Sequence, residues 1–292
     1  MIGFGGGSVL DVAKLAAVLH DHRDPVGAFF GIGLVPPRRV HLLCLPTTAG
    51  TGSEVSPNAV LYDEAAQLKM AVIGPSLVPD AAFVDPTLTI SVPPALTAAT
   101  GLDAFTHCVE AYANRFAHPF VDTFALEGIR RIAAHLPRAV QDGSDLEART
   151  HVALGSLYGG LCLGPVNTAA VHALAYPLGS RYRMAHGLSN ALLLPHVLRF
   201  NIEAMPARYA AVALALGASP GRDDHETAAR GIAKIDELCL ACGLAPSLSA
   251  HGVSANAIPE LAEAAMKVTR LLKNNPRALT RADAERIYRE AC

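Results

Sequence analysis

Residues 1–20, MIGFGGGSVLDVAKLAAVLH, place an apolar stub, three consecutive glycines and a segment of helical period one after another. Met1–Phe4 predicts a short strand, and the glycines that follow predict a tight turn. From Val9 to His20 apolar residues recur at helical spacing, with Ser8 as the expected N-cap. A strand that enters a helix through a glycine turn indicates an α/β unit. The free N–H groups and the dipole at the start of such a helix favour a phosphate.

The chain up to about residue 90 continues the α/β pattern. Apolar runs bounded by turn residues predict four further strands, at Val40–Leu45, Val55–Tyr62, Leu68–Ile73 and Ala82–Val84. The two middle runs form an expected pair, with Asp63 and Glu64 at the turn between them.

The character of the sequence changes near residues 91–94, Ser-Val-Pro-Pro. Alanine-rich helical segments then follow one another, punctuated by Gly143, Gly164 and a series of prolines (Pro137, Pro165, Pro177, Pro195, Pro206 and Pro276). We therefore expect an α/β domain over residues 1–92 and an all-helical domain over residues 93–292.

Composition narrows the class of protein. The 292 residues are 51% hydrophobic and 17% charged, with a net charge of −2, so no basic excess exists to hold nucleic acid. No apolar run is long enough for a membrane span, and no secretory signal pattern opens the chain. Six scattered cysteines are typical of reduced thiols, which favours a cytoplasmic location.

Four side chains form a candidate metal site. In TAATGLDAFTHCVEAY (residues 97–112), Asp103 and His107 stand four residues apart on one face of a predicted helix. His172 and His186 lie downstream in an apolar setting. One carboxylate and three imidazoles suit a divalent first-row metal with an open coordination position. The same pattern would arise if Asp103 and His107 only contacted each other on a helix face and the downstream histidines were hydrogen-bonded residues of the core. If the four meet, the Asp103 carboxylate should lie within about 5 Å of the imidazoles.

A second loop carries candidate nucleotide contacts. TTAGTGSE (residues 47–54) follows the strand predicted over Val40–Leu45 and is rich in hydroxyl groups and glycine. Open α/β sheets bind ligands at the carboxyl ends of their strands, so the hydroxyls could contact phosphate or ribose oxygens. An ordinary polar loop is the alternative interpretation. The two loops together favour a nucleotide.

These segments together resemble the iron-containing (group III) alcohol dehydrogenase family. The resemblance rests on GFGGGSVLDVAK, LPTTAGTGSEVS, PALTAATGLDAFTHCVEAY, VHALAYPLG, HGLSNALLLPHVLRFN and NNPRALT, which stand in family order across essentially the whole chain. It implies a dinucleotide-binding α/β domain, a helical metal-binding domain and an active site in the cleft between them. The implied activity is reversible hydride transfer between an alcohol and an aldehyde or ketone, with NAD or NADP as cofactor.

The resemblance also assigns residues. It implies that the metal, Fe²⁺ or Zn²⁺, is held by Asp103, His107, His172 and His186. It places the pyrophosphate turn at Gly6, Gly7 and Ser8, nucleotide-contacting hydroxyls at Thr47, Thr48 and Ser53, and Lys69 near the nicotinamide ribose. A homodimer is implied as well.

Two departures from the family pattern stand out. Many relatives carry a histidine four residues after the third ligand as a proton relay, and here that position is Tyr176. The phenol has an ordinary pKa of about 10, which makes it a poorer relay near neutral pH. Relatives also have a longer segment before the glycine turn, which holds the first strands and the acidic residue that selects NAD over NADP. We therefore expect a partial nucleotide domain, and a chain that binds metal but binds dinucleotide weakly. Sub-micromolar NADH affinity would contradict this expectation.

Two rival functions remain open at this stage. A maleylacetate reductase-like enzyme shares the fold and reduces a carbonyl acid, although VHALAYPLG is nearer the alcohol dehydrogenase pattern. A catalytically silent truncated fragment would bind metal but turn over no substrate.

Overall fold

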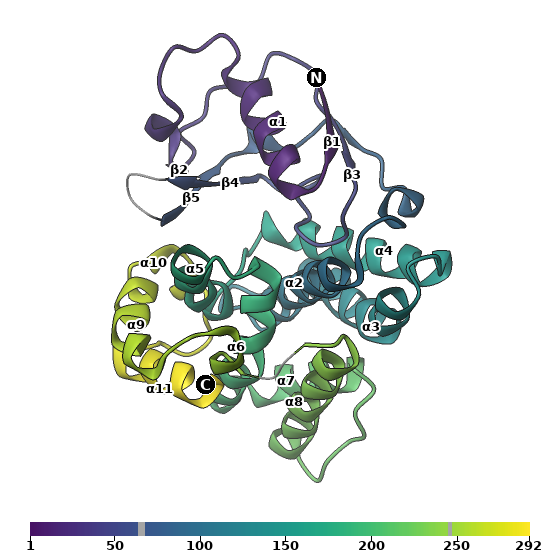
Figure 1. Ribbon diagram of the computed structural model, residues 1–292, viewed down its shortest axis with the longest axis vertical. Coiled ribbons are helices and arrows are strands. Elements are labelled where there is room, and N and C mark those ends of the chain that lie inside the picture. The colour runs from purple at the N-terminus through teal and green to yellow at the C-terminus, as the bar shows by residue number, and fades with distance from the viewer. Residues whose placement is uncertain (64–67, 245–246) are drawn as a thin grey trace.

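The computed structural model describes residues 1–63, 68–244 and 247–292. Figure 1 shows a small α/β part, which holds β1 to β5 and α1, above a larger part in which α2 to α11 pack together. Every regular element described from Pro94 onward is a helix. The predicted fold class, an α/β part followed by an all-α part, is confirmed. Among the described residues no helix is both long and apolar enough to cross a membrane.

Two small sheets make up the α/β part. In the first sheet, β1 (Ile2–Gly5) pairs in parallel with β3 (Leu43–Pro46), which pairs in parallel with β6 (Ala81–Ala82). In the second sheet, β5 (Leu68–Ile73) pairs antiparallel with β4 (Asn58–Asp63) and parallel with β2 (Gly31–Ile32). The predicted turn between β4 and β5 falls partly outside the described residues.

Helix α1 (Gly7–Leu19) packs between the two sheets. Its residues Leu10 and Ala17 are buried with Leu42 and Cys44 beside the first sheet. On its other face Leu15 and Val18 join a buried cluster with residues of β4 and β5. The two apolar faces of this helix thus hold both sheets in place.

The start of α1 differs from the sequence prediction. The N-cap is Gly6, whose carbonyl accepts hydrogen bonds from Val9 and Leu10, and Ser8 lies inside the first turn. A serine cap contributes only about 1 kcal/mol. Close packing outweighs that preference, because a Cβ built on Gly7 would lie 2.5 Å from Thr51 Cγ2. The turn therefore needs glycine where it touches the loop after β3.

Strand bounds also shift by one to three residues. The strand predicted over Val40–Leu45 is Leu43–Pro46, because its ladder partners on β1 span only Ile2–Gly5. The strand predicted over Val55–Tyr62 begins at Asn58, because the Gly52 carbonyl accepts from the amides of Val55 and Ser56 and forms a turn there. The strand predicted over Ala82–Val84 is Ala81–Ala82.

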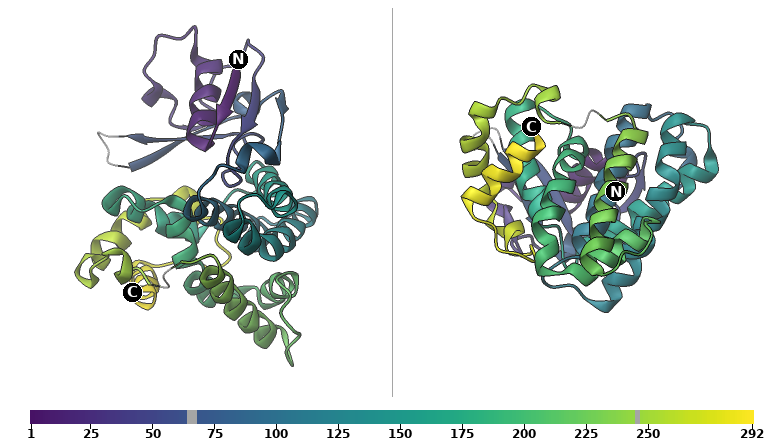
Figure 2. Two further views of the ribbon diagram at one scale, coloured as in Figure 1. Left: turned by 45° about the vertical axis from the view of Figure 1, so that its right-hand side comes forward. Right: turned by 90° about the horizontal axis from the view of Figure 1, so that it is seen from below.

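Helix α2 (Pro94–Tyr112) forms the centre of the helical part, and nearly every residue from Thr97 to its end is buried. Around it lie α3 (Pro119–Gln141), α4 (Leu146–Leu163), α5 (Ala170–Tyr182), α6 (His186–Asn201), α7 (Pro206–Ala215), α8 (Asp224–Ala241), α9 (Ile258–Met266), α10 (Thr269–Leu272) and α11 (Arg281–Ala291). Figure 1 and Figure 2 both show α3 and α4 on one side of the helical part and α9 and α11 on the other.

Three of the prolines expected to punctuate the helical segments lie inside helices instead. Pro137, Pro177 and Pro195 are interior residues of α3, α5 and α6. Each one removes a backbone donor, which weakens an isolated helix. Tertiary packing supplies most helix stability in a folded protein, and α5 and α6 are buried along most of their length. The helices therefore continue through the prolines.

Candidate metal centre and cofactor cavity

The structure brings the four predicted metal ligands together. Asp103 and His107 project from one face of α2, while His172 comes from the first turn of α5 and His186 is the first residue of α6. Asp103 Oδ1 lies 3.8 Å from His107 Nε2, 3.4 Å from His172 Nε2 and 3.7 Å from His186 Nε2. Asp103, His107 and His172 are buried, and His186 is half-buried. The limit of about 5 Å set by the sequence analysis is met.

A glycine allows His186 to reach this cluster. A Cβ built on Gly187 would lie 1.8 Å from the carbonyl oxygen of Ala99 and 3.1 Å from the Asp103 Cβ. No other residue type fits without moving α6 away from α2. The sequence His186-Gly187 therefore places an imidazole at a helix start that lies directly against the helix carrying Asp103.

The spacing of the cluster fits a cation between the side chains. The ligand atoms of Asp103, His107 and His172 all lie within 4.8 Å of one another. Two donors bound at about 2.1 Å to one tetrahedral ion lie about 3.4 Å apart, whereas a direct N–H···O hydrogen bond is about 2.9 Å long. The carboxylate-to-imidazole distances match the first arrangement better. A set of one carboxylate and three imidazoles suits iron or zinc.

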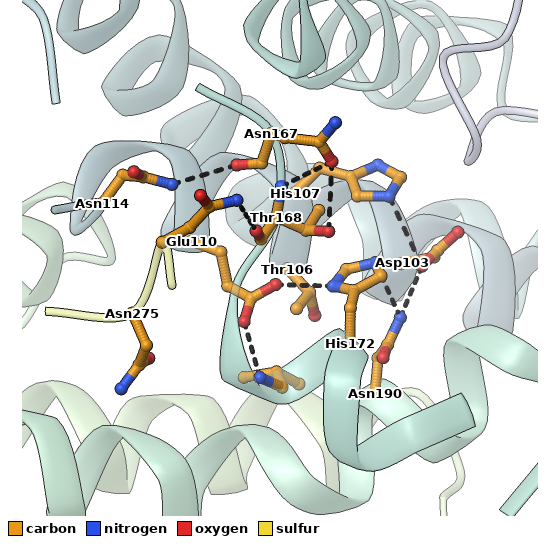
Figure 3. A network of polar contacts seen from close by, with 12 residues as sticks. Asp103, Thr106, His107, Glu110, Asn114, Asn167, Thr168, His172, Asn190 and Asn275 are labelled. Carbon is orange, nitrogen blue, oxygen red and sulfur yellow. Dashed lines mark hydrogen bonds and ion pairs between the residues drawn. The ribbon is translucent and has the colours of Figure 1, made fainter. Parts of the chain in front are cut away.

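Glu110 and Asn190 support the cluster, and neither was predicted from the sequence. The carboxylate of Glu110, one turn beyond His107, accepts hydrogen bonds of 2.6 Å from His172 Nδ1 and from the Val171 amide (Figure 3). It thereby orients the imidazole and satisfies an amide at the start of α5, whose N-cap residue provides no side-chain bond. The Asn190 Nδ2 donates to Asp103 Oδ1 at 2.7 Å and lies 3.1 Å from His172 Nε2.

Charge interactions inside the cluster are strong. Burial alone would raise the pKa of Asp103, but the imidazoles of His107, His186 and His172 together hold it well below its usual range. Burial lowers the pKa of His107 to about 4 and that of His186 well below 6.5. Although burial opposes it, the carboxylates of Glu110 and Asp103 raise the pKa of His172 to about 9. The carboxylate stays ionised, as a metal ligand must be.

A cavity of about 320 Å³ joins this cluster to the α/β part. Its wall includes Asp103, His107, His172 and His186 from the helices, and Gly7, Ser8, Thr51, Ser53 and Lys69 from the α/β part. Such a volume, lined by both parts of the chain and by a few convergent polar groups, is typical of a ligand site.

The predicted cofactor residues occupy two positions relative to this cavity. Gly7, Ser8, Ser53 and Lys69 line it. Gly6 and Thr48 are not among its lining residues and lie next to each other, since a Cβ built on Gly6 would be 3.5 Å from the Thr48 hydroxyl oxygen. Thr47 donates its amide to the Gly5 carbonyl and so joins the loop to the glycine turn. Thr51 lines the cavity as well, although only its neighbours in the loop were predicted as contacts.

A buried lysine fixes the hydroxyl loop to α1. The Lys14 ammonium donates to the backbone carbonyls of Ser53 and Asn58 at 2.7 and 2.6 Å and to Ser53 Oγ at 3.1 Å. The Ser53 hydroxyl in turn donates to Asp11 at 2.5 Å. Burial lowers the pKa of Lys14 to about 8. The Ser53 hydroxyl therefore donates its proton to Asp11, and toward a ligand it could act only as a hydrogen-bond acceptor.

Tyr176 lies beside the metal cluster, one helical turn beyond His172. Its ring centroid is 5.7 Å from that of His186, and the Lys69 Nζ is 5.8 Å from the same tyrosine ring. Burial raises the pKa of Tyr176, and the positive charge of Arg270 only partly opposes that effect. The hydroxyl is therefore protonated near neutral pH.

The chain matches known proteins along its whole length. Residues 1–86 match the family model for iron-containing alcohol dehydrogenase, and residues 97–292 match that for the C-terminal part of the same family. The long-chain-alcohol dehydrogenase 1 of Geobacillus thermodenitrificans is 41% identical, over 100% of this chain and 74% of its own length. The 1,3-propanediol dehydrogenase of Klebsiella pneumoniae is 37% identical, over 100% of this chain and 75% of its own length.

A solved structure agrees with these relatives. That of a 1,3-propanediol oxidoreductase superposes with a TM-score of 0.96 at 37% identity and covers 100% of this chain and 76% of that one. Family models, sequence relatives and a solved structure agree on one assignment, in keeping with the cluster of one carboxylate and three imidazoles. This protein belongs to the iron-containing alcohol dehydrogenase family.

Proposed function

We propose that this chain interconverts an alcohol and its aldehyde or ketone at the cavity described above. Membership of the family makes it an oxidoreductase that acts with a nicotinamide cofactor. The observation that carries the site assignment is the meeting of one carboxylate with three imidazoles on the cavity wall. The proposed metal ligands are Asp103, His107, His172 and His186.

Residues of the helical part and of the α/β part have different roles in this reaction. Iron held by Asp103 and the three histidines would supply a Lewis acid for the substrate oxygen, and a nicotinamide cofactor would supply the hydride donor or acceptor. Asp103 supplies the negative charge of the metal site, and Glu110 orients His172 from behind. Burial of the cluster excludes water and strengthens the electrostatic interactions within it.

The α/β side of the cavity is suited to the phosphates and ribose of the cofactor. The start of α1 opens at Gly7 and Ser8, where free amides and the helix dipole favour negative charge. We place the remaining contacts at Gly6, Thr47, Thr48, Ser53 and Lys69. The adjacency of the loop to the turn supports this placement.

Metal removal tests the function directly. A chain stripped by a chelator is expected to lose NADH-dependent aldehyde reduction and to regain it when Fe²⁺ is added without oxygen. Mg²⁺ should not restore turnover, because it prefers oxygen donors. Fe²⁺ at 100 times its Kd should also stabilise the fold by about 2.7 kcal/mol, which thermal unfolding measures. Full activity in the stripped chain would contradict the proposal.

Tyr176 is expected to have a small role in proton transfer. General acid–base groups typically contribute about 10²- to 10⁴-fold to the rate, but burial raises the pKa of this phenol. Tyr176→Phe should therefore change the turnover rate by less than about 10-fold, with bound metal unchanged. Tyr182→Phe, on the same helix, is the matched control. A loss of bound metal in the Tyr176 variant would show that the hydroxyl supports the cluster instead.

We also propose that this chain forms a homodimer and is located in the cytoplasm. All six cysteines are free thiols, as a reducing compartment favours. Ile2 and Phe4 project from the same face of β1 and are 66% and 57% exposed, so that this strand presents an apolar surface. Such a surface supports association with another polypeptide. Light scattering coupled to gel filtration measures the oligomeric state.

A further inference from the structure

Two cationic side chains on the cavity wall, Lys69 and Arg270, have no paired carboxylate among the described residues. The lining carboxylates, Asp11 and Asp103, are both engaged: Asp11 accepts from Ser53 and the Val60 amide, and Asp103 faces the imidazoles. Within the described parts of the chain, neither Lys69 nor Arg270 has a carboxylate within 4 Å. Both are half-buried and line the cavity. Cations held this way are suited to an anionic ligand.

Arg270 stands on the metal side of the cavity. It lines the cavity with Tyr176, whose hydroxyl is influenced by the positive charge of the guanidinium, and the tyrosine ring packs against His186. The next residue, Leu271, is fully buried in a cluster with Ala173 and Tyr176, which fixes the segment to α5. The guanidinium carries five N–H donors, and among the described residues none of them pairs with a carboxylate.

The other cation has a place in the proposed cofactor site, whereas Arg270 does not. Lys69 comes from β5 in the α/β part and is assigned to the nicotinamide ribose. Arg270 comes from α10 in the helical part, while the glycine turn proposed for the pyrophosphate belongs to the α/β part. Arg270 lines the cavity together with Tyr176 and His186, whose rings lie 5.7 Å apart between centroids.

We propose that Arg270 binds a carboxylate at the far end of the substrate, so that the enzyme prefers short-chain oxo acids and the matching hydroxy acids. The inference rests on the proposed function and specifies its substrate class. The carbonyl carbon gains a hydride from NADH and its oxygen gains a proton from solvent, while the carboxylate is unchanged. A guanidinium can hold that carboxylate with two parallel hydrogen bonds.

Paired substrates test this inference. With iron-loaded enzyme and NADH, kcat/KM is measured for 4-oxobutanoate and for butanal, which differ in the carboxylate. Arg270→Leu is expected to lower kcat/KM for the oxo acid by about 10- to 100-fold, the value of a hydrogen bond to a charged group, and to leave butanal within about threefold. Lys273→Leu removes an exposed cation three residues away and should change neither value.

A binding measurement separates this inference from the function itself. Calorimetric titration of 4-hydroxybutanoate into the metal-loaded chain should show at least 10-fold weaker binding in Arg270→Leu and no change in Lys273→Leu. The difference in binding is expected even if the enzyme reduces neither aldehyde. Failure to reduce either aldehyde would overturn the proposed function but not the role of Arg270 in binding. Equal losses for both aldehydes, a raised KM for NADH with unchanged preference, or unchanged 4-hydroxybutanoate binding would each overturn the role of Arg270.

Discussion

Asp103→Asn is expected to abolish both metal binding and turnover while preserving the fold. The carboxylate is the only anionic donor in the proposed ligand set, and its oxygen faces all three imidazole Nε2 atoms within 3.8 Å. An amide of the same shape cannot supply the negative charge that offsets a divalent cation. Metal affinity should fall by more than about 100-fold, beyond the usual effect of residues that only support a ligand. Turnover should fall by at least about 10³-fold.

Competition with a chromogenic chelator measures the affinity, and steady-state NADH oxidation measures turnover. Asp236→Asn is the matched control, since this carboxylate pairs with Arg199 on the surface of α8 and α6, outside the cavity. The unfolding temperature of the metal-free Asp103 variant shows whether the fold survives. Metal affinity equal to that of the unchanged chain would mean that the cluster is a buried polar network and not a metal site.

Local sequence pattern was enough to place part of the centre. The i, i+4 spacing of Asp103 and His107 correctly predicts that both project from one face of a helix. The same spacing extended to i+7 reaches Glu110, so a signal for this residue was present in the sequence. Likewise, Asn190 stands four residues after His186. Neither polar residue was predicted, because the prediction concerned only direct metal ligands.

Contacts between distant segments could not be derived from local pattern. The sequence pattern offered His172 and His186 as candidate ligands but left open whether they meet Asp103 and His107, and the position of His186 depends on the close approach of Gly187 to Ala99. Arg270 lies outside every motif, and its place in the cavity follows from the burial of Leu271 against α5. The incorrect N-cap at Ser8 has a similar origin, since a tertiary contact at Gly7 outweighed a local preference.

Glu110→Gln is expected to weaken metal binding by forcing a conflict on His172. The Glu110 carboxylate accepts at 2.6 Å from both His172 Nδ1 and the Val171 amide, so both of its oxygens are used as acceptors. Glutamine has one acceptor oxygen and one NH₂ donor. If its oxygen stays with Val171, the NH₂ faces Nδ1 and favours the tautomer whose proton sits on Nε2. That tautomer has no lone pair for the metal. If the amide is reversed, its NH₂ group faces the Val171 N–H, and two donors oppose each other without an acceptor.

In either orientation a neutral amide replaces the carboxylate, so a charge-assisted buried hydrogen bond is lost or weakened, and the metal-free chain should lose about 1–3 kcal/mol of stability. Metal affinity should fall by about 10- to 100-fold, as is usual when a carboxylate that supports a histidine ligand is removed. Thr106→Val is the matched control, because its buried hydroxyl on the same helix donates only to the Leu102 carbonyl and should not change metal affinity. Calorimetric titration with Zn²⁺ or Co²⁺ separates the two effects. A loss of stability with affinity unchanged within threefold would mean that Glu110 merely caps α5, since capping acts on the fold whereas selecting a tautomer acts on the ligand atom.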